Sequence, residues 1–241
     1  MTLKDKRVVV VGGSSGIGYA VAAGAAGEGA RVVIGSSSRD KVDAAVGRLG
    51  GSASGFALDV TDQADVERAF SGLDGFDHLV FTAGDWGGPR RGAIGDLEID
   101  AAKSMFNVRF WGAMAVVKAA LGKIAPDGSI TLTNGMIAHR PRPGASVSTA
   151  MAAAVEHFAV GLAVELAPIR VNCVCPGYVR TEVWASIPAE TREAQLQAFT
   201  KGQPLARVGE PEEVARAYLY AMAGGYTTGQ VLKVDGGMSI V

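Results

Sequence analysis

Four consecutive valines near the start of the chain lead directly into a glycine-rich turn. Residues 7–11 (RVVVV) are too few for a helix and too apolar for a sheet edge, so they predict a buried central strand. Three glycines follow in the spacing GxxxGxG, and an Ala/Gly-rich stretch to about residue 28 predicts a helix. Such a turn directs backbone N–H groups and a helix N-terminus at an anion. The segment therefore predicts a dinucleotide site with phosphate contacts from Gly12, Ser14, Ser15, Gly16, Ile17 and Gly18.

Strand patterns alternate with helical patterns along the rest of the chain. Further strands are expected at residues 31–35, 54–58, 78–81, 129–133, 170–174 and 230–234, and a long helical segment at 97–123. This alternation with short loops is typical of a doubly wound parallel sheet, so we expect one α/β domain of Rossmann type over residues 1–241. Ligands of this fold lie off the carboxyl ends of the strands, which should bring together Gly12, Asp59, Val60, Ala83 and Gly84.

The residues after the second predicted strand carry hydroxyl groups and a cation instead of an acid. An NAD site usually has Asp or Glu here, which accepts hydrogen bonds from the adenosine ribose. This chain has Ser36, Ser37 and Ser38, followed by Arg39. Hydroxyl and guanidinium donors suit a 2′-phosphate, so we predict NADP as the cofactor and keep NAD as the alternative. The serines also suit the N-terminus of a helix at residues 39–49.

Composition excludes several classes of partner. Lys plus Arg number 23 and Asp plus Glu 24, so the chain has no positive excess that would favour nucleic acid or an anionic membrane. The N-terminal apolar run is short and passes into the glycine turn, so we expect no signal peptide or membrane span and a cytoplasmic protein. Cys173 and Cys175 are the only cysteines, and we expect reduced core residues and no metal site. A small-molecule ligand fits this composition best.

Several motifs, in order along the chain, resemble the short-chain dehydrogenase/reductase family, and the resemblance covers essentially the whole chain. They are the glycine turn, Asp59 with Val60, TAG at 82–84, Asn107, PGYVRT at 176–181 and VDGG at 234–237. The resemblance implies a parallel sheet of about seven strands, a homodimer or tetramer (a mixed oligomer being the alternative), and cofactor contacts from Pro176, Gly177, Val179 and Thr181. A loop at 85–96 and a helical flap at 184–203 should shape the substrate pocket.

The family's usual catalytic residues are Asn, Ser, Tyr and Lys, and the resemblance finds only the first of these retained, at Asn107. The Tyr and Lys positions, four apart on one helix face, fall on Ser148 and Ala152. The Ser position falls on Gly135. An aliphatic hydroxyl is a far weaker acid than a phenol, so the usual proton donation is expected to be lost.

We therefore predict an NAD(P)-binding, oxidoreductase-like protein that is catalytically degenerate and serves as a cofactor-binding or regulatory subunit. The alternative is an active NADP-dependent carbonyl reductase or alcohol dehydrogenase. Its proton would come from Tyr178, from His139 or from a water molecule held by Asn107. The sequence does not identify the substrate.

Overall fold

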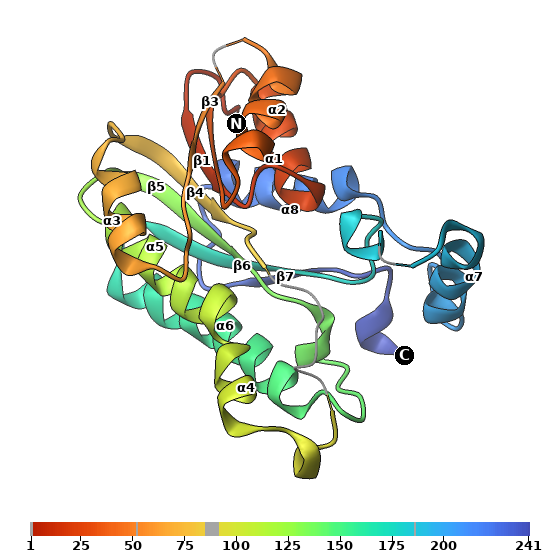
Figure 1. Cartoon of the computed structure of the whole chain (residues 1–241). Coiled ribbons are helices and arrows are strands. Elements are labelled where there is room, and N and C mark those ends of the chain that lie inside the picture. Colours follow the sequence, from red (N-terminus) through yellow and green to blue (C-terminus); the bar gives the residue numbers. More distant parts are fainter. Residues whose placement is uncertain (1, 52, 85–91, 186) are drawn as a thin grey trace.

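The computed structural model describes residues 2–51, 53–84, 92–185 and 187–241. Its centre is a parallel sheet of seven strands in the order β3-β2-β1-β4-β5-β6-β7 (Figure 1). The strands are β1 (Arg7–Val11), β2 (Arg31–Ser36), β3 (Ser54–Ala57), β4 (Phe76–Phe81), β5 (Ile124–Thr133), β6 (Arg170–Pro176) and β7 (Val231–Val234). The strand order reverses between β1 and β4, which opens a crevice at their carboxyl ends. The predicted fold class is confirmed.

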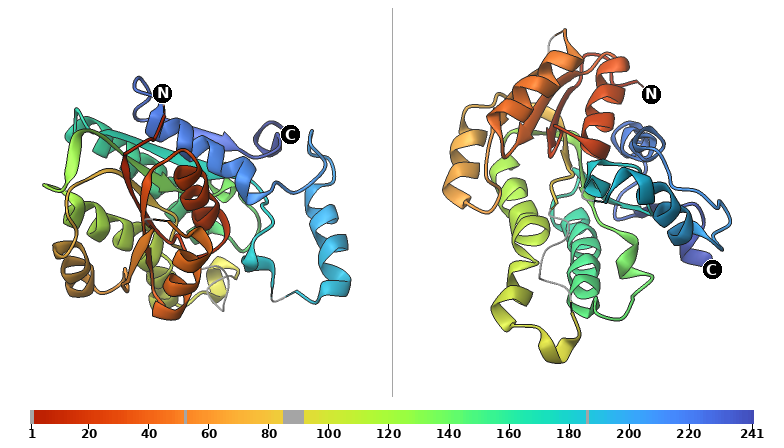
Figure 2. Two further views of the ribbon diagram at one scale, coloured as in Figure 1. Left: turned by 90° about the horizontal axis from the view of Figure 1, so that it is seen from above. Right: turned by 45° about the vertical axis from the view of Figure 1, so that its right-hand side comes forward.

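Helices cover both faces of the sheet (Figures 1 and 2). The helices of one layer are α1 (Gly16–Gly27), α2 (Arg39–Leu49) and α8 (Pro211–Ala223), and those of the other are α3 (Gln63–Ser71), α5 (Ala113–Ala120) and α6 (Ser146–Glu165). Each helix layer forms a core cluster with one face of the sheet. Because side chains alternate along a strand, Val8 and Val10 of β1 belong to the cluster with α1, α2 and α8, and Val9 and Val11 belong to the cluster with α3, α5 and α6. β1 is buried on both faces, as its four valines predict.

The segment 97–123, expected to be one long helix, is divided. A π-helical turn, η2 (Asn107–Gly112), lies between α4 (Ile99–Ser104) and α5. A π turn adds a residue to the helical register and often occurs at functional positions. Gly112 ends the turn in close contact with Val60, because a Cβ at Gly112 would lie 2.9 Å from Val60 Cγ2. The extra residue changes which side chains of this segment face the sheet.

The segment 184–203 is largely helical, as predicted. It contains α7 (Ala189–Thr200), which follows a 3-10 turn, η4 (Glu182–Trp184). α7 stands apart from the sheet and from the helices that cover it (Figures 1 and 2). Residue 186 and most of the predicted 85–96 loop, residues 85–91, lie outside the described residues.

α6 is a 20-residue helix with a mean hydropathy of 1.5. Within the described ranges it is the one helix that is long and apolar enough to cross a membrane, a test that the core helices of soluble proteins also pass. Its residues Val155, Ala159 and Leu162 are buried in the core cluster between α6 and the sheet. This packing accounts for the apolar residues on the face of α6 that covers the sheet.

One imidazole is buried inside the sheet. His78 of β4 lies beside Ser129 of β5, and its Nδ1 is 2.9 Å from Ser129 Oγ. The side chain of His78 is 4% exposed. Burial lowers the pKa of His78 from 6.5 to about 4, because the charged imidazolium would lose its hydration there.

The buried imidazole predicts a loss of stability in acid. Since the folded-state pKa of His78 lies below the unfolded value, the unfolded chain binds more protons as the pH falls below 6.5. The free energy of unfolding should fall by about 3 kcal/mol between the unfolded and folded pKa values, and this contribution should level off below about pH 4. Urea denaturation across this range measures the slope.

His78→Gln should remove most of the slope that this group contributes. His157→Gln is the matched control, because His157 is exposed. An identical slope in wild type and His78→Gln would contradict the assignment.

Candidate nucleotide and substrate site

The turn between β1 and α1, the phosphate loop, packs against the end of β4 without room for side chains. A Cβ on Gly12, which has φ +90°, would lie 2.5 Å from Ala83 N. A Cβ on Gly18 would lie 2.2 Å from Gly12 O and 2.4 Å from Thr82 Oγ1. The N-cap of α1, Ser15, makes no side-chain capping hydrogen bond. The first N–H groups of α1 are therefore suited to an anionic ligand.

The chain after β6 returns to this loop. A Cβ on Gly16 would lie 3.2 Å from both Thr181 Cγ2 and Glu182 Oε2, so the predicted contact residue Thr181 does lie at the N-terminus of α1. Gly177 approaches the backbone of Asp235, where a Cβ would lie 2.8 Å from Asp235 Cα. Pro176, the last residue of β6, is buried. Val179 is 6% exposed and belongs to the core cluster of α1 and α8.

The serines after β2 divide between the loop and α2. Ser36 Oγ is 2.8 Å from Ser14 Oγ. Ser37 is exposed. Ser38 is the N-cap of α2 and accepts a hydrogen bond from Lys41 N at 3.4 Å. The capping role considered for the serines is confirmed for Ser38.

Two arginines of α2 lie near these hydroxyl groups. Arg39 is exposed, and its Nε donates to Asp43 Oδ2 at 3.0 Å. Arg48, which sequence reasoning missed, donates from Nη2 to Ser14 O at 3.1 Å, and its guanidinium lies 3.8 Å from the centre of the Tyr19 ring. No local motif marks Arg48, because its contact joins residues 34 apart in the chain.

The two residues after β3 take up different environments. Asp59 Oδ1 accepts hydrogen bonds from Thr61 N at 2.8 Å and from Thr61 Oγ1 at 2.7 Å. These bonds lower the pKa of Asp59 below its usual value, so the carboxylate is ionised at neutral pH. Val60 is buried against Gly112 of η2.

A buried arginine lies against the residues that follow β4. Asn107 is exposed, whereas Arg109, two residues further along η2, is 7% exposed. A Cβ on Gly84 would lie 2.7 Å from Arg109 Nη2, so the guanidinium faces the residues that follow β4. Positions two apart point to different sides of a helix. The role of Asn107 stays a prediction, and the cation inside the apolar string NVRFWG was the available signal for Arg109.

The three positions that the resemblance assigned to the family's Ser, Tyr and Lys lie just after β5 and in the first two turns of α6. Gly135 is buried just after β5. Ser148 lies in the first turn of α6, and its Oγ donates to Met105 Sδ at 3.8 Å. Ala152 follows one turn later and is 2% exposed. None of the three side chains is an acid suited to work near neutral pH.

A network of buried polar side chains lies beside these positions. His139 Nε2 is 2.8 Å from Glu156 Oε1, and Asn134 Nδ2 donates to the same carboxylate oxygen. Glu156 is 6% exposed and Asn134 1% exposed. Sequence reasoning missed both partners of His139. The spacing of Ser148, Ala152 and Glu156, four residues apart on one helix face, was the available signal for Glu156.

Cys175 completes a group of potential metal ligands. Donor atoms of His139, Glu156 and Cys175 all lie within 4.8 Å of one another. Burial, together with the nearby Glu156 carboxylate, raises the pKa of the Cys175 thiol, and a protonated thiol is a poor metal ligand. We therefore interpret the group as a hydrogen-bonded network around Glu156.

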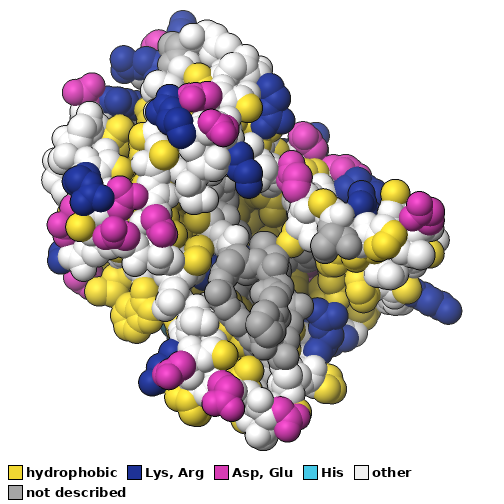
Figure 3. All heavy atoms as spheres, viewed as in Figure 1, with side chains coloured by type: hydrophobic (Ala, Val, Ile, Leu, Met, Phe, Trp, Pro, Cys, Tyr) yellow, Lys and Arg dark blue, Asp and Glu magenta, His cyan; other side chains and the backbone are white. Residues whose placement is uncertain are grey.

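A pocket of about 360 Å³ opens next to this network. It is lined by His139, Arg140, Pro141, Arg142 and Met238. Tyr178 contributes an aromatic surface nearby, since the Arg142 guanidinium lies 5.9 Å from the centre of its ring. The Tyr178 ring stacks on Phe199 of α7 with centroids 5.3 Å apart. Figure 3 shows that the face of the molecule seen in Figure 1 is hollowed, with apolar side chains visible inside the hollow.

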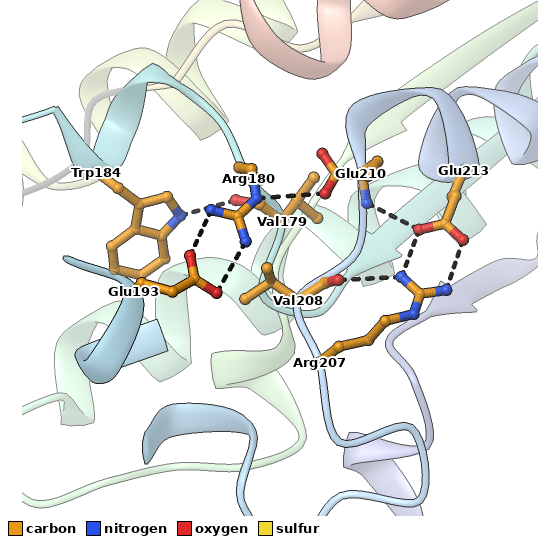
Figure 4. Close-up of polar contacts among 8 residues, drawn as sticks. All are labelled: Val179, Arg180, Trp184, Glu193, Arg207, Val208, Glu210 and Glu213. Carbon is orange, nitrogen blue, oxygen red and sulfur yellow. Dashed lines mark hydrogen bonds and ion pairs between the residues drawn. The ribbon is translucent and has the colours of Figure 1, made fainter. Parts of the chain in front are cut away.

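Ion pairs of Arg180 join α7 to the start of α8 (Figure 4). Arg180 Nη1 lies 2.9 Å from Glu193 Oε2 of α7, and its Nε lies 3.3 Å from Glu210 Oε1 at the start of α8. The indole of Trp184 donates to Val179 O at 2.7 Å. These contacts link η4 and α7 to the segment after β6 and to the start of α8.

Comparison with known proteins gives consistent matches. A family model described as enoyl-(acyl carrier protein) reductase matches residues 11–239. The short-chain dehydrogenase/reductase malC of Malbranchea aurantiaca is 34% identical over 253 residues, 98% of this chain and 95% of the relative. The solved structure of the MalC reductase/Diels-Alderase from that organism has a TM-score of 0.91 and 33% identity, covering 99% of this chain and 98% of the other. A small-chain dehydrogenase in complex with NADPH has a TM-score of 0.81 and 33% identity, covering 99% and 100%.

The packing of the phosphate loop predicts that a glycine-to-alanine substitution lowers the stability of the protein at Gly18 and raises it at Gly27, both in α1. Gly18→Ala puts its Cβ against Gly12 O, so the loop must shift, and the free energy of unfolding should fall by about 1–3 kcal/mol. At Gly27 a Cβ meets no atom within 4 Å, so Gly27→Ala should raise stability by about 0.5–1 kcal/mol. Chemical denaturation measures both changes, and equal stability of the two variants would show that the loop is not closely packed.

Proposed function

Because the chain belongs to the short-chain dehydrogenase/reductase family, we propose that it is an NADP-dependent reductase of small carbonyl compounds that takes its proton from His139. The observation that carries this proposal is the 2.8 Å contact between His139 Nε2 and the buried carboxylate of Glu156, at the wall of the pocket. The proposal develops the active-enzyme alternative of the sequence analysis and gives the histidine a partner.

The residues at the phosphate loop fit the dinucleotide. Gly12 and Gly18 allow the backbone contact that aims the N-terminus of α1, and the Ser15 side chain does not cap that helix. At the adenosine end, the hydroxyl and guanidinium groups would hold a 2′-phosphate: Ser36, Ser37, Arg39 and Arg48. The similar chain solved with NADPH supports NADP over NAD.

The bound nicotinamide supplies a hydride, and the protein must supply a proton to the carbonyl oxygen. His139 suits this role because Glu156 occupies Nε2, which leaves Nδ1 of the protonated ring as the donor. The carboxylate orients the imidazole and balances the charge of the imidazolium. Asn134 holds the carboxylate in place by donating to the same oxygen.

Arg109 provides a second favourable group. Its guanidinium is buried beside Gly84, just after β4, where a cation favours the negative charge that develops on a carbonyl oxygen during reduction. Tyr178, the other proton donor considered from the sequence, stacks on Phe199 and packs near Trp184. We therefore assign Tyr178 to the aromatic surface beside the pocket.

The second candidate is a nucleotide-binding protein without reductase activity, the cofactor-binding or regulatory subunit predicted from the sequence. The observation that favours it is the set of side chains at Gly135, Ser148 and Ala152, where neither a phenol nor an amine is present. The similar MalC protein is described as a reductase and a Diels-Alderase. A reaction that needs no proton donor is therefore a further outcome of the test. Consumption of NADPH separates the two candidates.

We further propose that the chain is a cytoplasmic homo-oligomer, a dimer or tetramer. Large apolar side chains of η2, α5 and α6 are exposed: Trp111 (54%), Met114 (44%), Val160 (41%) and Val164 (81%). A surface of this kind is typical of an interface between subunits. The molar mass in solution, measured by light scattering, tests this proposal.

The 2′-phosphate site predicts a specific loss of NADPH affinity. Arg48→Met should weaken NADPH binding about tenfold or more, because a charge-assisted contact to the 2′-phosphate is removed, and should leave NADH binding unchanged. Fluorescence titration with both nucleotides measures the two dissociation constants. Arg31→Met, at the amino end of β2, is the control. Equal losses for NADPH and NADH would assign Arg48 a structural role.

His139→Gln should lower the rate of NADPH oxidation with an aldehyde panel by a factor of about 10² to 10⁴, the usual range for loss of a general acid. NADPH affinity should not change. Tyr178→Phe is the matched control and should keep its activity. Wild-type protein that binds NADPH and oxidises none with any aldehyde would favour the second candidate, and loss of turnover in Tyr178→Phe alone would assign the proton to the phenol.

A further inference from the structure

We infer that the pocket beside His139 is an anion subsite, and that the substrate is a small carbonyl compound bearing a carboxylate that Arg140 and Arg142 bind. This inference rests on the proposed reductase function. It identifies the chemical class of the substrate from the charges at the pocket wall. Three of the five lining residues, His139, Arg140 and Arg142, carry nitrogen donors.

The two arginines of the pocket have no acidic partner within the described part of the chain. Arg140 and Arg142 are exposed, and neither forms an ion pair with a described residue. By contrast, Arg39, Arg180 and Arg207 are each paired with a carboxylate. The guanidinium groups at the pocket are therefore available for an external anion.

Two carboxylates close to the pocket-lining residues, those of Asp235 and Glu156, already accept hydrogen bonds from other groups. Asp235 precedes Met238, and its carboxylate accepts hydrogen bonds from Gly237 N at 3.0 Å and Ser239 N at 2.7 Å. Glu156 is buried and accepts from His139 and Asn134. Neither carboxylate pairs with the two arginines.

Arg142 is positioned by an aromatic surface. Its guanidinium lies 5.9 Å from the centre of the Tyr178 ring, within the range of a cation–π contact. Tyr178 is in turn fixed by stacking on Phe199. A guanidinium held in one orientation binds a carboxylate with two parallel hydrogen bonds at a smaller entropic cost.

The size and remaining lining of the pocket limit the substrate. A volume of about 360 Å³ lies near the lower end of the range for small-molecule pockets. Pro141 and Met238 supply an apolar surface for the body of the ligand. Because His139 lines the same pocket, a carboxylate on the arginines would leave the carbonyl of a compact molecule close to the proposed proton donor.

The test uses two aldehydes that differ in charge and little in shape, 4-carboxybenzaldehyde and methyl 4-formylbenzoate. With NADPH, wild type should reduce the carboxylate with a kcat/KM about tenfold or more above that of the ester, the worth of one charge-assisted pair. In Arg140→Met/Arg142→Met the ratio of the two kcat/KM values should fall to about one. Arg142→Lys should keep part of the preference, and Arg31→Met should keep all of it. A preference for the ester in wild type, or an intact preference in the double variant, would overturn the inference.

A binding measurement separates failure of the subsite from failure of the proposed function. Calorimetric titration of the protein with NADP⁺ present should show tighter binding of 4-carboxybenzaldehyde than of the ester in wild type and no difference in the double variant. If no aldehyde is reduced but this difference in binding appears, the reductase proposal fails and the anion subsite stands. If aldehydes are reduced and the two bind equally, the subsite fails and the reductase stands.

Discussion

The contact of the phosphate loop with the end of β4 determines the geometry of the whole crevice. Gly18 lies against Gly12 O, and Thr82 Oγ1 donates to Val11 O at 3.2 Å, so the first helix starts within van der Waals distance of two strands. Only glycine permits this approach at Gly12 and Gly18. The contact fixes the direction of the N-terminus of α1 and thereby the end of the crevice at which an anion binds. The substrate then binds at the opposite end of the crevice, away from the phosphate loop.

At the substrate side, a buried carboxylate imposes the second constraint. An ionised carboxylate removed from water costs several kcal/mol unless hydrogen bonds and a positive partner compensate for the loss of hydration. Glu156 receives these contacts from Asn134 and His139, which come from the segment after β5. The requirement to stabilise Glu156 therefore also orients the imidazole at the pocket wall. Stability and the proposed chemistry depend on the same three side chains.

The local features were predictable from the sequence, and the long-range ones were not. The valines of β1, the glycine spacing and the N-cap at Ser38 each depend on neighbouring residues, and the structure agrees with all three. Arg48 reaches Ser14 through a contact across 34 residues, which no periodicity reveals. The burial of Arg109 was not predictable either, because the sequence favoured one continuous helix over residues 97–123 and the structure has a π turn there. The contact of His139 with Glu156 likewise depends on the packing of α6 against the residues after β5.

The central claim is that a proton from His139 accompanies hydride transfer from NADPH. A crystal structure of the complex with NADP⁺ and 4-(hydroxymethyl)benzoate, the product of the carboxylate probe, tests it most directly. The account predicts the alcohol oxygen within hydrogen-bond distance of His139 Nδ1, directly or through one water, and the alcohol carbon about 3–3.5 Å from the reacting nicotinamide carbon. A product oxygen that contacts Tyr178 or another side chain while His139 stays remote would contradict the account.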